Sequence, residues 1–404
     1  MSPRKVQFKS PVSGQRKLPR RVDEVELLIR DLASDGRGVG EAPDGQVVFV
    51  SGAWVGERVH VRRTRHGATT STQLINVIEA CEERIEPPCT HHRQNQCGGC
   101  PWMFVSYEAQ LSAKADKLKA SLESLSASQI ALVVHPSPQQ LGYRNRAQLK
   151  TNGKVLGYLA ASSHEIVDVT DCPILTEQNQ AQLNRLRDRL PNNKWRPRSR
   201  QKWVTLDIDD QRSSPLINQR QPFRQANDDQ NAAMSRWLAR TLKLPAPPGG
   251  LLELFCGSGN LTSVLARCFP DHKITAVEGD EVPLEELSHL GLPNVATQRR
   301  DLFSARDIKA MAATLPSNQG VVLDPPRDGL RERDALAPLF SQSPWVVYIS
   351  CNLATWQRDA HFLQNLGLTL TQIEGLDMFP QTPHLEVLSV FERKQRMFTA
   401  TVDW

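Results

Sequence analysis

The stretch Leu251-Leu252-Glu253-Leu254-Phe255-Cys256-Gly257-Ser258-Gly259-Asn260 decides the fold of this protein. Its first five residues predict a buried strand, the next five a tight glycine loop, and Leu261 to Cys268 a helix. Glycine lets the backbone approach a bound nucleoside, and the start of a helix offers free N–H groups. Because dinucleotide sites and S-adenosylmethionine (SAM) sites share this pattern, it predicts a nucleoside-binding α/β domain without choosing between the two cofactors.

More strands that end in polar residues follow along the chain. A strand over 274–277 ends at Glu278, where a carboxylate can bind ribose hydroxyls, and the next leads to Asp301, which can contact an adenine edge. A further strand, over 321–323, ends in Asp324-Pro325-Pro326-Arg327. In open α/β sheets ligands bind outside the carboxyl ends of the strands. The stiff proline turn favours SAM-dependent modification of a nucleobase over hydride transfer.

A cysteine and a glutamate stand at the edges of two later strands. The apolar run 345–349 leads to Ser350-Cys351-Asn352, and Glu386 opens the apolar strand 387–391. A thiol at a strand's exit faces the ligand cleft, although a single cysteine is more often inert packing. Cys351 is therefore a candidate nucleophile and Glu386 a candidate base, whereas a surface charge at a strand end is the alternative for Glu386.

The positive charge of the chain is concentrated at its beginning. The 404 residues carry a net charge of +5, and residues 1–21 hold seven Lys/Arg and no Asp/Glu. Such a tail is typical of a disordered arm that binds a nucleic-acid backbone, and a solubilising or cloning-derived tail is the alternative. No apolar stretch approaches a membrane span, and no signal peptide is evident. We expect a cytoplasmic protein that does not contact membranes, with its eight cysteines reduced or bound to metal.

Residues 22–80 predict a small β-barrel with short strands at 25–29, 46–50, 58–62 and 73–78. The segments Asp35-Gly36-Arg37-Gly38-Val39-Gly40 and Gly56-Glu57-Arg58-Val59 resemble the TRAM domain, an RNA-binding barrel. Arg62, Arg63, Arg65 and His66 form a basic strand end that can hold phosphates, or a solvated barrel edge.

Four cysteines indicate a metal centre in a central α+β domain. Cys89, Cys97 and Cys100 are clustered, and Cys172 stands apart. Four thiolates can hold an iron–sulfur cluster or a zinc ion, and His91 and His92 keep zinc open. In the same region Asn152-Gly153 predicts a hairpin. The segment Tyr143-Arg144-Asn145-Arg146 has the composition that stacks on and neutralises single-stranded RNA, unless the hairpin simply faces water.

Taken together, four motifs resemble the RNA uracil-C5 methyltransferases: 254–260, Asp324-Pro325-Pro326-Arg327, Ser350-Cys351-Asn352, and Phe379-Pro380 followed by His384-Leu385-Glu386. The TRAM-like start and the cysteines narrow the resemblance to the iron–sulfur branch that methylates 23S ribosomal RNA. It implies a seven-stranded methyltransferase domain whose last strands form a hairpin. It also implies that Cys89, Cys97, Cys100 and Cys172 hold a [4Fe–4S] cluster, and that the SAM site is lined by Gln225, Phe255, Asn260, Glu278, Asp301 and Asp324.

We therefore expect four regions: a basic tail (1–21), a TRAM-like barrel (22–80), a central domain with the cluster (81–243) and a Rossmann-like SAM-dependent methyltransferase domain (244–404). Uracil C5 is too weak a nucleophile to take a methyl group unaided, so Cys351 would first add to C6 and Glu386 would later remove the C5 proton. Asp324 would bind the uracil or position Cys351. We expect a monomer acting on a flipped-out uridine. An RNA N-methyltransferase, or a non-catalytic RNA-binding or redox-sensing protein, remains the alternative.

Overall fold

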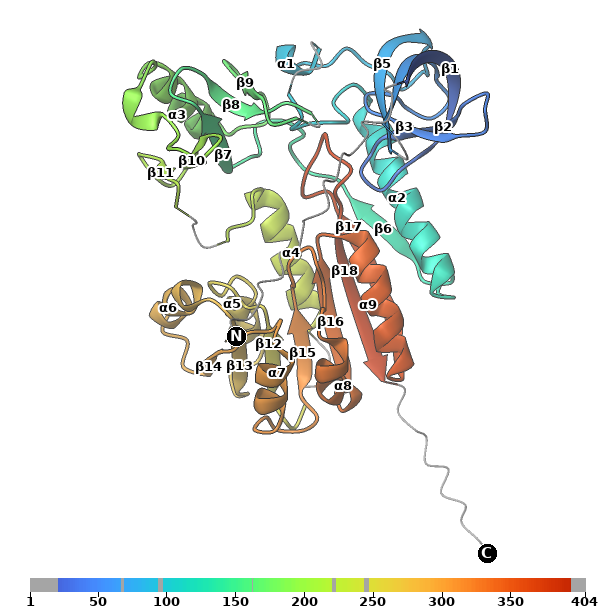
Figure 1. The fold of residues 1–404 in the computed structure, drawn as a ribbon. Helices are drawn as coiled ribbons and strands as arrows, with labels where there is room; N and C mark the ends of the chain where they lie inside the picture. Colours follow the sequence, from blue (N-terminus) through green and yellow to red (C-terminus); the bar gives the residue numbers. More distant parts are fainter. Residues whose placement is uncertain are drawn as a thin grey trace, which may run out of the picture. The chain divides into compact units, whose positions relative to one another are not determined.

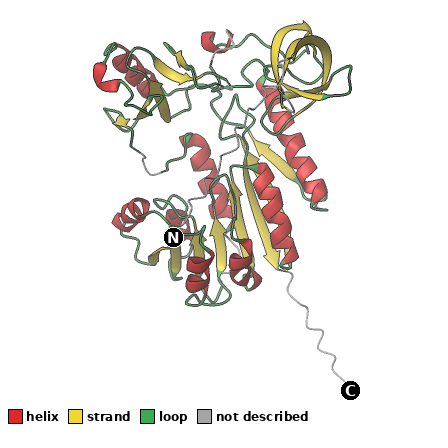
Figure 2. Ribbon diagram, viewed as in Figure 1, coloured by secondary structure: helices red, strands yellow, loops and turns green. Residues whose placement is uncertain are grey.

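The computed structural model describes residues 21–66, 69–93, 97–161, 163–219, 223–242 and 247–393. Nearly all of the predicted basic tail lies outside these residues. The chain divides into two units, Met1–Arg84 and Ile85–Trp404, which are described separately. Among the described residues, no helix combines the length and the apolar character that a bilayer crossing requires. Figure 1 follows the chain in sequence colours, and Figure 2 separates its helices from its strands.

The first unit is a curled antiparallel sheet in the strand order β3-β2-β1-β4-β5. The strands are β1 (Arg21–Leu32), β2 (Gly38–Glu41), β3 (Val47–Val50), β4 (Arg58–His66) and β5 (Thr69–Glu79). Alternate residues such as Val48 and Val50 are buried in its core. The two outer strands of the sheet approach each other. Gln46, directly before β3, donates from its Nε2 to Thr70 Oγ1 of β5 at 2.8 Å. The predicted barrel-like sheet is thereby confirmed.

Two details of this unit differ from expectation. No strand was predicted between residues 29 and 46, yet β2 forms there and pairs with both β1 and β3. A Cβ at Gly38 would lie 2.9 Å from the Ala53 carbonyl oxygen, so glycine serves close packing there. The predicted basic strand end is also mostly neutralised: Arg63 is buried and contacts Asp23 at 2.7 Å and Asp44 at 3.0 Å. Arg63 is therefore a structural cation and is not available to phosphates.

The second unit is built on an eight-stranded sheet in the order β14-β13-β12-β15-β16-β18-β17-β6. In chain order these strands are β6 (Leu132–His135), β12 (Leu251–Leu254), β13 (Ile274–Glu278), β14 (Val295–Arg299), β15 (Gly320–Leu323), β16 (Trp345–Ser350), β17 (Leu368–Leu376) and β18 (Glu386–Arg393). Strands β12 to β16 are parallel, and β18 runs antiparallel to both β16 and β17. The expected α/β fold and terminal hairpin are both present.

Helices cover both faces of this sheet (Figure 1). They are α2 (Tyr107–Ser124), α4 (Asp228–Thr241), α5 (Thr262–Cys268), α6 (Glu281–His289), α7 (Ala305–Ala312), α8 (Arg333–Ser341) and α9 (Leu353–Asn365). Successive strand residues face opposite sides, so Leu251 belongs to the core beneath α4 and α5, while Leu252 belongs to the core on the other face, which includes residues of α2, α8 and α9. This alternation between two buried faces explains the uninterrupted apolar strands.

The eighth strand comes from far upstream. Strand β6 pairs in parallel with β17, and Leu118 and Leu122 of α2 belong to the same core as the sheet. The family resemblance implied seven strands, and we expected residues 107–135 to belong to the central domain. Packing instead joins them to the eight-stranded sheet.

A smaller sheet of the second unit has the order β11-β10-β7-β8-β9. Its strands are β7 (Arg146–Thr151), β8 (Leu156–Leu159), β9 (Ile166–Asp168), β10 (Val204–Asp209) and β11 (Leu216–Ile217), and three short elements accompany it: α1 (Thr90–Arg93), α3 (Glu177–Arg187) and the 3₁₀ helix η1 (Asn193–Trp195). The predicted hairpin joins β7 to β8, with Gly153 at a φ of +85°. Cys172 belongs to the core of this layer, and the other three predicted cluster cysteines pack against it.

Candidate active site

Five of the predicted site residues line one edge of the large sheet. Phe255, Asp301 and Asp324 follow β12, β14 and β15, Glu278 ends β13, and Cys351 follows β16. The neighbouring order β14-β13-β12-β15-β16 therefore places them in the row Asp301, Glu278, Phe255, Asp324, Cys351. Parallel strands bring their carboxyl ends to one edge, so residues far apart in sequence face a common site.

The glycine loop after β12 is fastened at several points. Phe255 has a φ of +62°, a left-handed conformation that turns the chain sharply out of the strand. The Glu278 carboxylate accepts hydrogen bonds from the N–H groups of Gly257 (3.2 Å) and Gly279 (2.8 Å). Asp301 Oδ1 accepts from the Phe303 N–H at 2.9 Å. The two acidic side chains thus shape the loops from which a nucleoside would be bound.

Asn260 is held by a residue that the sequence did not single out. Its side-chain amide donates to Asn231 Oδ1 at 2.9 Å and accepts from Asn231 Nδ2 at 3.0 Å. Asn231 lies on α4, and Gln225 is buried just before that helix. No sequence signal marks Asn231, because a single polar residue on a helix reads as solvent-exposed.

A buried carboxyl lies beneath the same loop. Glu253 of β12 is 1% exposed, and among the described residues its Oε2 has no hydrogen-bond partner. Burial, with a smaller contribution from Asp324, raises the pKa of Glu253 to about 8, while hydrogen bonding by Thr262 opposes the rise. Glu253 is therefore largely protonated at neutral pH.

Sheet register brings Cys351 and Glu386 together. Ser350 of β16 pairs with Val387 of β18 in an antiparallel ladder. Cys351 directly follows β16, and Glu386 precedes Val387 in β18, so the register places these two residues side by side at the end of the ladder. Burial, followed by the charges of Glu386 and Asp324, raises the pKa of the Cys351 thiol to about 12.

The two carboxyls beside this thiol are themselves perturbed. Burial raises the pKa of Asp324 to about 7. Glu386 is 2% exposed, and burial together with Asp324 raises its pKa well above the usual range. Among the residues that the structure describes, Glu386 Oε1 has no hydrogen-bond partner. A buried carboxyl with an unpartnered oxygen and a raised pKa beside a thiol is typical of a catalytic pair.

Arg327 is the cation of this group. Its charge opposes the rise in the pKa of both Cys351 and Glu386. Its carbonyl oxygen accepts hydrogen bonds from Asn352 Nδ2 and Thr355 Oγ1, each at 3.1 Å, so the segment after Cys351 holds the proline turn in place. Arg327 belongs to the motif Asp324-Pro325-Pro326-Arg327 but was not among the predicted site residues. Its position directly after a strand-ending Asp-Pro-Pro is the sequence signal that could have identified it.

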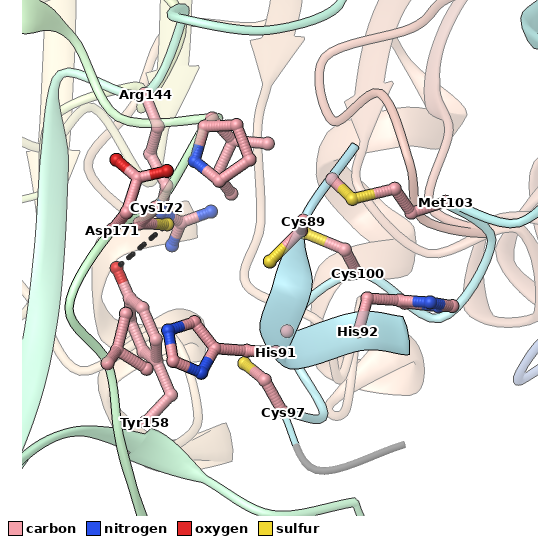
Figure 3. Close-up of a pocket in the computed structure, with 14 residues that line it drawn as sticks. Cys89, His91, His92, Cys97, Cys100, Met103, Arg144, Tyr158, Asp171 and Cys172 are labelled. Atoms are coloured by element: carbon pink, nitrogen blue, oxygen red, sulfur yellow. Dashed lines mark hydrogen bonds between the residues drawn. The ribbon is translucent and has the colours of Figure 1, made fainter. Parts of the chain in front are cut away.

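The four predicted cluster cysteines surround a separate cavity of about 120 Å³ (Figure 3). Cys89, Cys97 and Cys100 lie around α1, and Cys172 lies in the loop between β9 and α3. Burial raises the pKa of Cys172 to about 11 and that of Cys97 and Cys100 above the usual value. The structure thus brings these cysteines to one cavity. Among the described side chains, however, no group of three or more His, Cys, Asp or Glu converges as the ligands of a metal ion would.

The prediction that segment 143–146 stacks on and neutralises RNA is wrong for Tyr143 and Arg146. Tyr143 is buried, and its hydroxyl donates to the Pro380 carbonyl at 3.1 Å. Arg146 pairs with the buried Asp207 at 2.8 Å. Arg144 lines the cysteine cavity and lies 6.0 Å from the centre of the Phe379 ring. Tyr143 and Arg146 therefore serve the core of the protein, because tertiary contacts occupy the groups that could have bound RNA.

Two known protein families match this chain, one at its TRAM-like start and one over the sheets that carry the candidate site. The family described as tRNA (Uracil-5-)-methyltransferase matches residues 157–394, and the TRAM domain matches residues 20–65. An uncharacterized RNA methyltransferase of Nitrosomonas europaea is 35% identical over 91% of this chain and 96% of the relative. The 23S rRNA (uracil(1939)-C(5))-methyltransferase RlmD of Halomonas elongata is 32% identical over 91% of this chain and 89% of its own length.

A solved structure has the same fold. The Pyrococcus abyssi tRNA (uracil-54, C5)-methyltransferase, crystallised with S-adenosyl-L-homocysteine, superposes with a TM-score of 0.66 at 20% identity, covering 90% of this chain and 99% of that chain. The chain is a methyltransferase with a TRAM domain, and it belongs to the tRNA (uracil-5-)-methyltransferase family.

Proposed function

We propose that this enzyme methylates C5 of a uridine in 23S ribosomal RNA, with SAM as methyl donor. The observation that carries the proposal is the meeting of Cys351 and Glu386 at the end of the β16–β18 ladder. An enzyme that methylates an exocyclic amine needs neither a thiol nor a second buried carboxyl at that position. Relatives named for uracil 1939 make that nucleotide the first position to test.

In this mechanism the Cys351 thiol and the Glu386 carboxyl first lose their protons to solvent. The thiolate then attacks C6 of the uracil, and the C5–C6 π electrons move toward C5 and the O4 carbonyl. Arg327 beside the thiol favours its ionised form. Bound SAM would supply an activated methyl group to C5. Glu386 then takes the C5 proton, the electrons of that C–H bond restore the C5–C6 double bond, and the sulfur leaves C6. Every bond that Cys351 forms is broken again, so the thiol is regenerated.

The same row of strand ends supports a methyl-donor site. Phe255, Asn260, Glu278 and Asp301 would hold the nucleoside part, with Gln225 before α4 and Asp324 toward the uracil. The target base must leave the RNA stack for both its faces to be reached, so we propose a flipped-out uridine. The TRAM domain would bind the RNA, and we expect a monomer acting in the cytoplasm.

We also propose a [4Fe–4S] cluster at the cysteine cavity, held by Cys89, Cys97, Cys100 and Cys172. Four thiols around one cavity are the ligand set that such a cluster uses. His91 is not placed to help bind a zinc ion through Nε2, because that atom accepts the Thr170 N–H at 3.2 Å. Protein purified without oxygen should contain iron and sulfide and absorb visible light. Bound zinc without iron would overturn this assignment.

RNA that contains 5-fluorouridine tests the methylation mechanism. Fluorine replaces the proton that Glu386 must remove, so the enzyme should remain covalently linked to the RNA through Cys351 in the presence of SAM. The adduct should resist denaturing electrophoresis and map to the Cys351 peptide. Methylation of natural RNA without any trapped adduct would favour an N-methyltransferase. Absence of methyl transfer to any RNA would favour a non-catalytic RNA-binding or redox-sensing protein.

A further inference from the structure

The segment between β17 and β18, residues 377–385, is anchored by a buried ion pair. Asp377 directly follows β17, and its Oδ1 lies 2.5 Å from Lys114 Nζ of α2. Both side chains are fully buried. Tyr107, also on α2, donates its hydroxyl to Asp377 Oδ2 at 2.8 Å, so both carboxylate oxygens have partners from one helix.

A second buried contact joins the same helix to the same segment. Gln110 Oε1 accepts the Gln381 N–H, and Gln110 Nε2 donates to Gln381 Oε1, each at 2.9 Å. Lys114 Nζ also lies 3.4 Å from the Phe379 carbonyl oxygen. Tyr107, Gln110 and Lys114 follow one another at helical spacing, so one face of α2 is devoted to holding this segment.

Glu386 begins the strand that this segment enters. Among the described residues its Oε1 has no hydrogen-bond partner, so hydrogen bonding does not hold that oxygen in place. Its position is determined by the backbone, which β18 holds on one side and segment 377–385 on the other. A buried ion pair adds little to stability compared with apolar packing of equal size, but it fixes one arrangement of the groups it joins.

We propose that Lys114 and Asp377 are positioning residues for Glu386. They hold segment 377–385 so that the carboxyl reaches the proton on C5, and they touch neither the RNA base nor the methyl donor. This inference rests on the proposed uracil-C5 chemistry. It predicts a defect confined to the last step, because attack by Cys351 and methyl transfer both precede removal of the proton.

The test replaces both partners at once, as Lys114→Met/Asp377→Asn, so that no buried charge is left unpaired. Formation of the 5-fluorouridine adduct, which does not need Glu386, should stay within about twofold of the native rate, whereas tritium release from RNA labelled at C5 of uridine should slow by about 10- to 100-fold. With natural RNA the variant should accumulate a covalent protein–RNA complex that carries the labelled methyl group. Glu386→Gln should show the same pattern more strongly.

Lys119→Met, at an exposed position of the same helix, is the matched control and should behave as the native enzyme. Thermal unfolding checks that the double variant is folded. If it is not, Tyr107→Phe removes one hydrogen bond to Asp377 and should give a weaker form of the same pattern. Adduct formation and tritium release that fall together, or that both stay unchanged, would overturn the positioning role. A native enzyme that neither forms the adduct nor releases tritium would refute the proposed function itself.

Discussion

Cys351 and Glu386 stand opposite each other because Ser350 and Val387 are the last pair of the β16–β18 ladder. The thiol follows the end of one strand, and the carboxyl begins its antiparallel neighbour. The charge of Glu386 contributes to the raised pKa of Cys351, which shows that the two groups interact.

Cys351→Ala should lower methylation by about 10³-fold or more, because it removes the thiol that would attack C6 and that interacts with Glu386. The 5-fluorouridine adduct should disappear as well. Methyl incorporation into RNA measures the first effect and denaturing electrophoresis the second. Cys268→Ala, on α5, should leave both unchanged. Substantial turnover by Cys351→Ala would rule out the covalent mechanism.

Asp324→Asn should make Cys351 of the free enzyme more reactive above pH 7. The Asp324 carboxyl has a pKa of about 7, so above that pH it is ionised and holds the pKa of the thiol up. Removing this charge lowers the pKa of Cys351, and each unit of lowering raises the thiolate fraction about tenfold. Alkylation by iodoacetamide, followed by mass spectrometry of the Cys351 peptide, should be faster in the variant at pH 9.

The difference in alkylation should vanish below pH 6, where Asp324 is protonated and uncharged in the native enzyme too. Equal or slower alkylation of Asp324→Asn at pH 9 would contradict the proposed electrostatic coupling.

Glu253→Gln should stabilise the protein at alkaline pH. The pKa of Glu253 rises from its usual 4.5 to about 8 on folding, so the folded state binds the proton more tightly than the unfolded state. Stability therefore falls as pH rises between these two values, and it stays reduced above pH 8. Relative to the native protein, the variant should gain up to about 3 kcal/mol in free energy of unfolding between pH 5 and pH 8.5.

Denaturant unfolding at the two pH values measures this gain. Glu285→Gln, at an exposed position on α6, serves as the control and should show little pH-dependent difference. If the difference in free energy of unfolding between Glu253→Gln and the native protein does not change with pH, the pKa of Glu253 is not raised in the folded state.

Asn231→Ala should weaken binding of the methyl donor. It removes both hydrogen bonds that hold the Asn260 amide, which together contribute about 1–2 kcal/mol, so binding should weaken by about 5- to 30-fold. Calorimetry with S-adenosylhomocysteine measures the affinity. Affinity for RNA should stay unchanged, as should both affinities in Asp229→Ala, at an exposed position of the same helix. An equal loss of RNA binding would indicate a general disturbance of α4.

Local sequence patterns predicted much of this protein. The apolar run ending at Phe255, with the glycine loop and helix after it, identified the nucleoside-binding end of the sheet. Glu278, Asp324 and Cys351 were assigned to strand ends on the same reasoning, and the structure places them there. Such predictions succeed because strand ends are local signals and parallel strands share one edge.

Only the tertiary structure decided which groups face one another. The sequence shows that Tyr143 and Arg146 are an aromatic and a cation, but burial against Pro380 and Asp207 removes both from an RNA-binding role. The sequence likewise does not show that Lys114 of α2 meets Asp377, which lies 263 positions further along the chain. Periodicity reports that a side chain is buried, whereas its partner depends on long-range strand order and helix packing. The residue types of Cys351 and Glu386 therefore suggested the proposed chemistry. The register that places these two residues side by side depends on the pairing of β16 with β18.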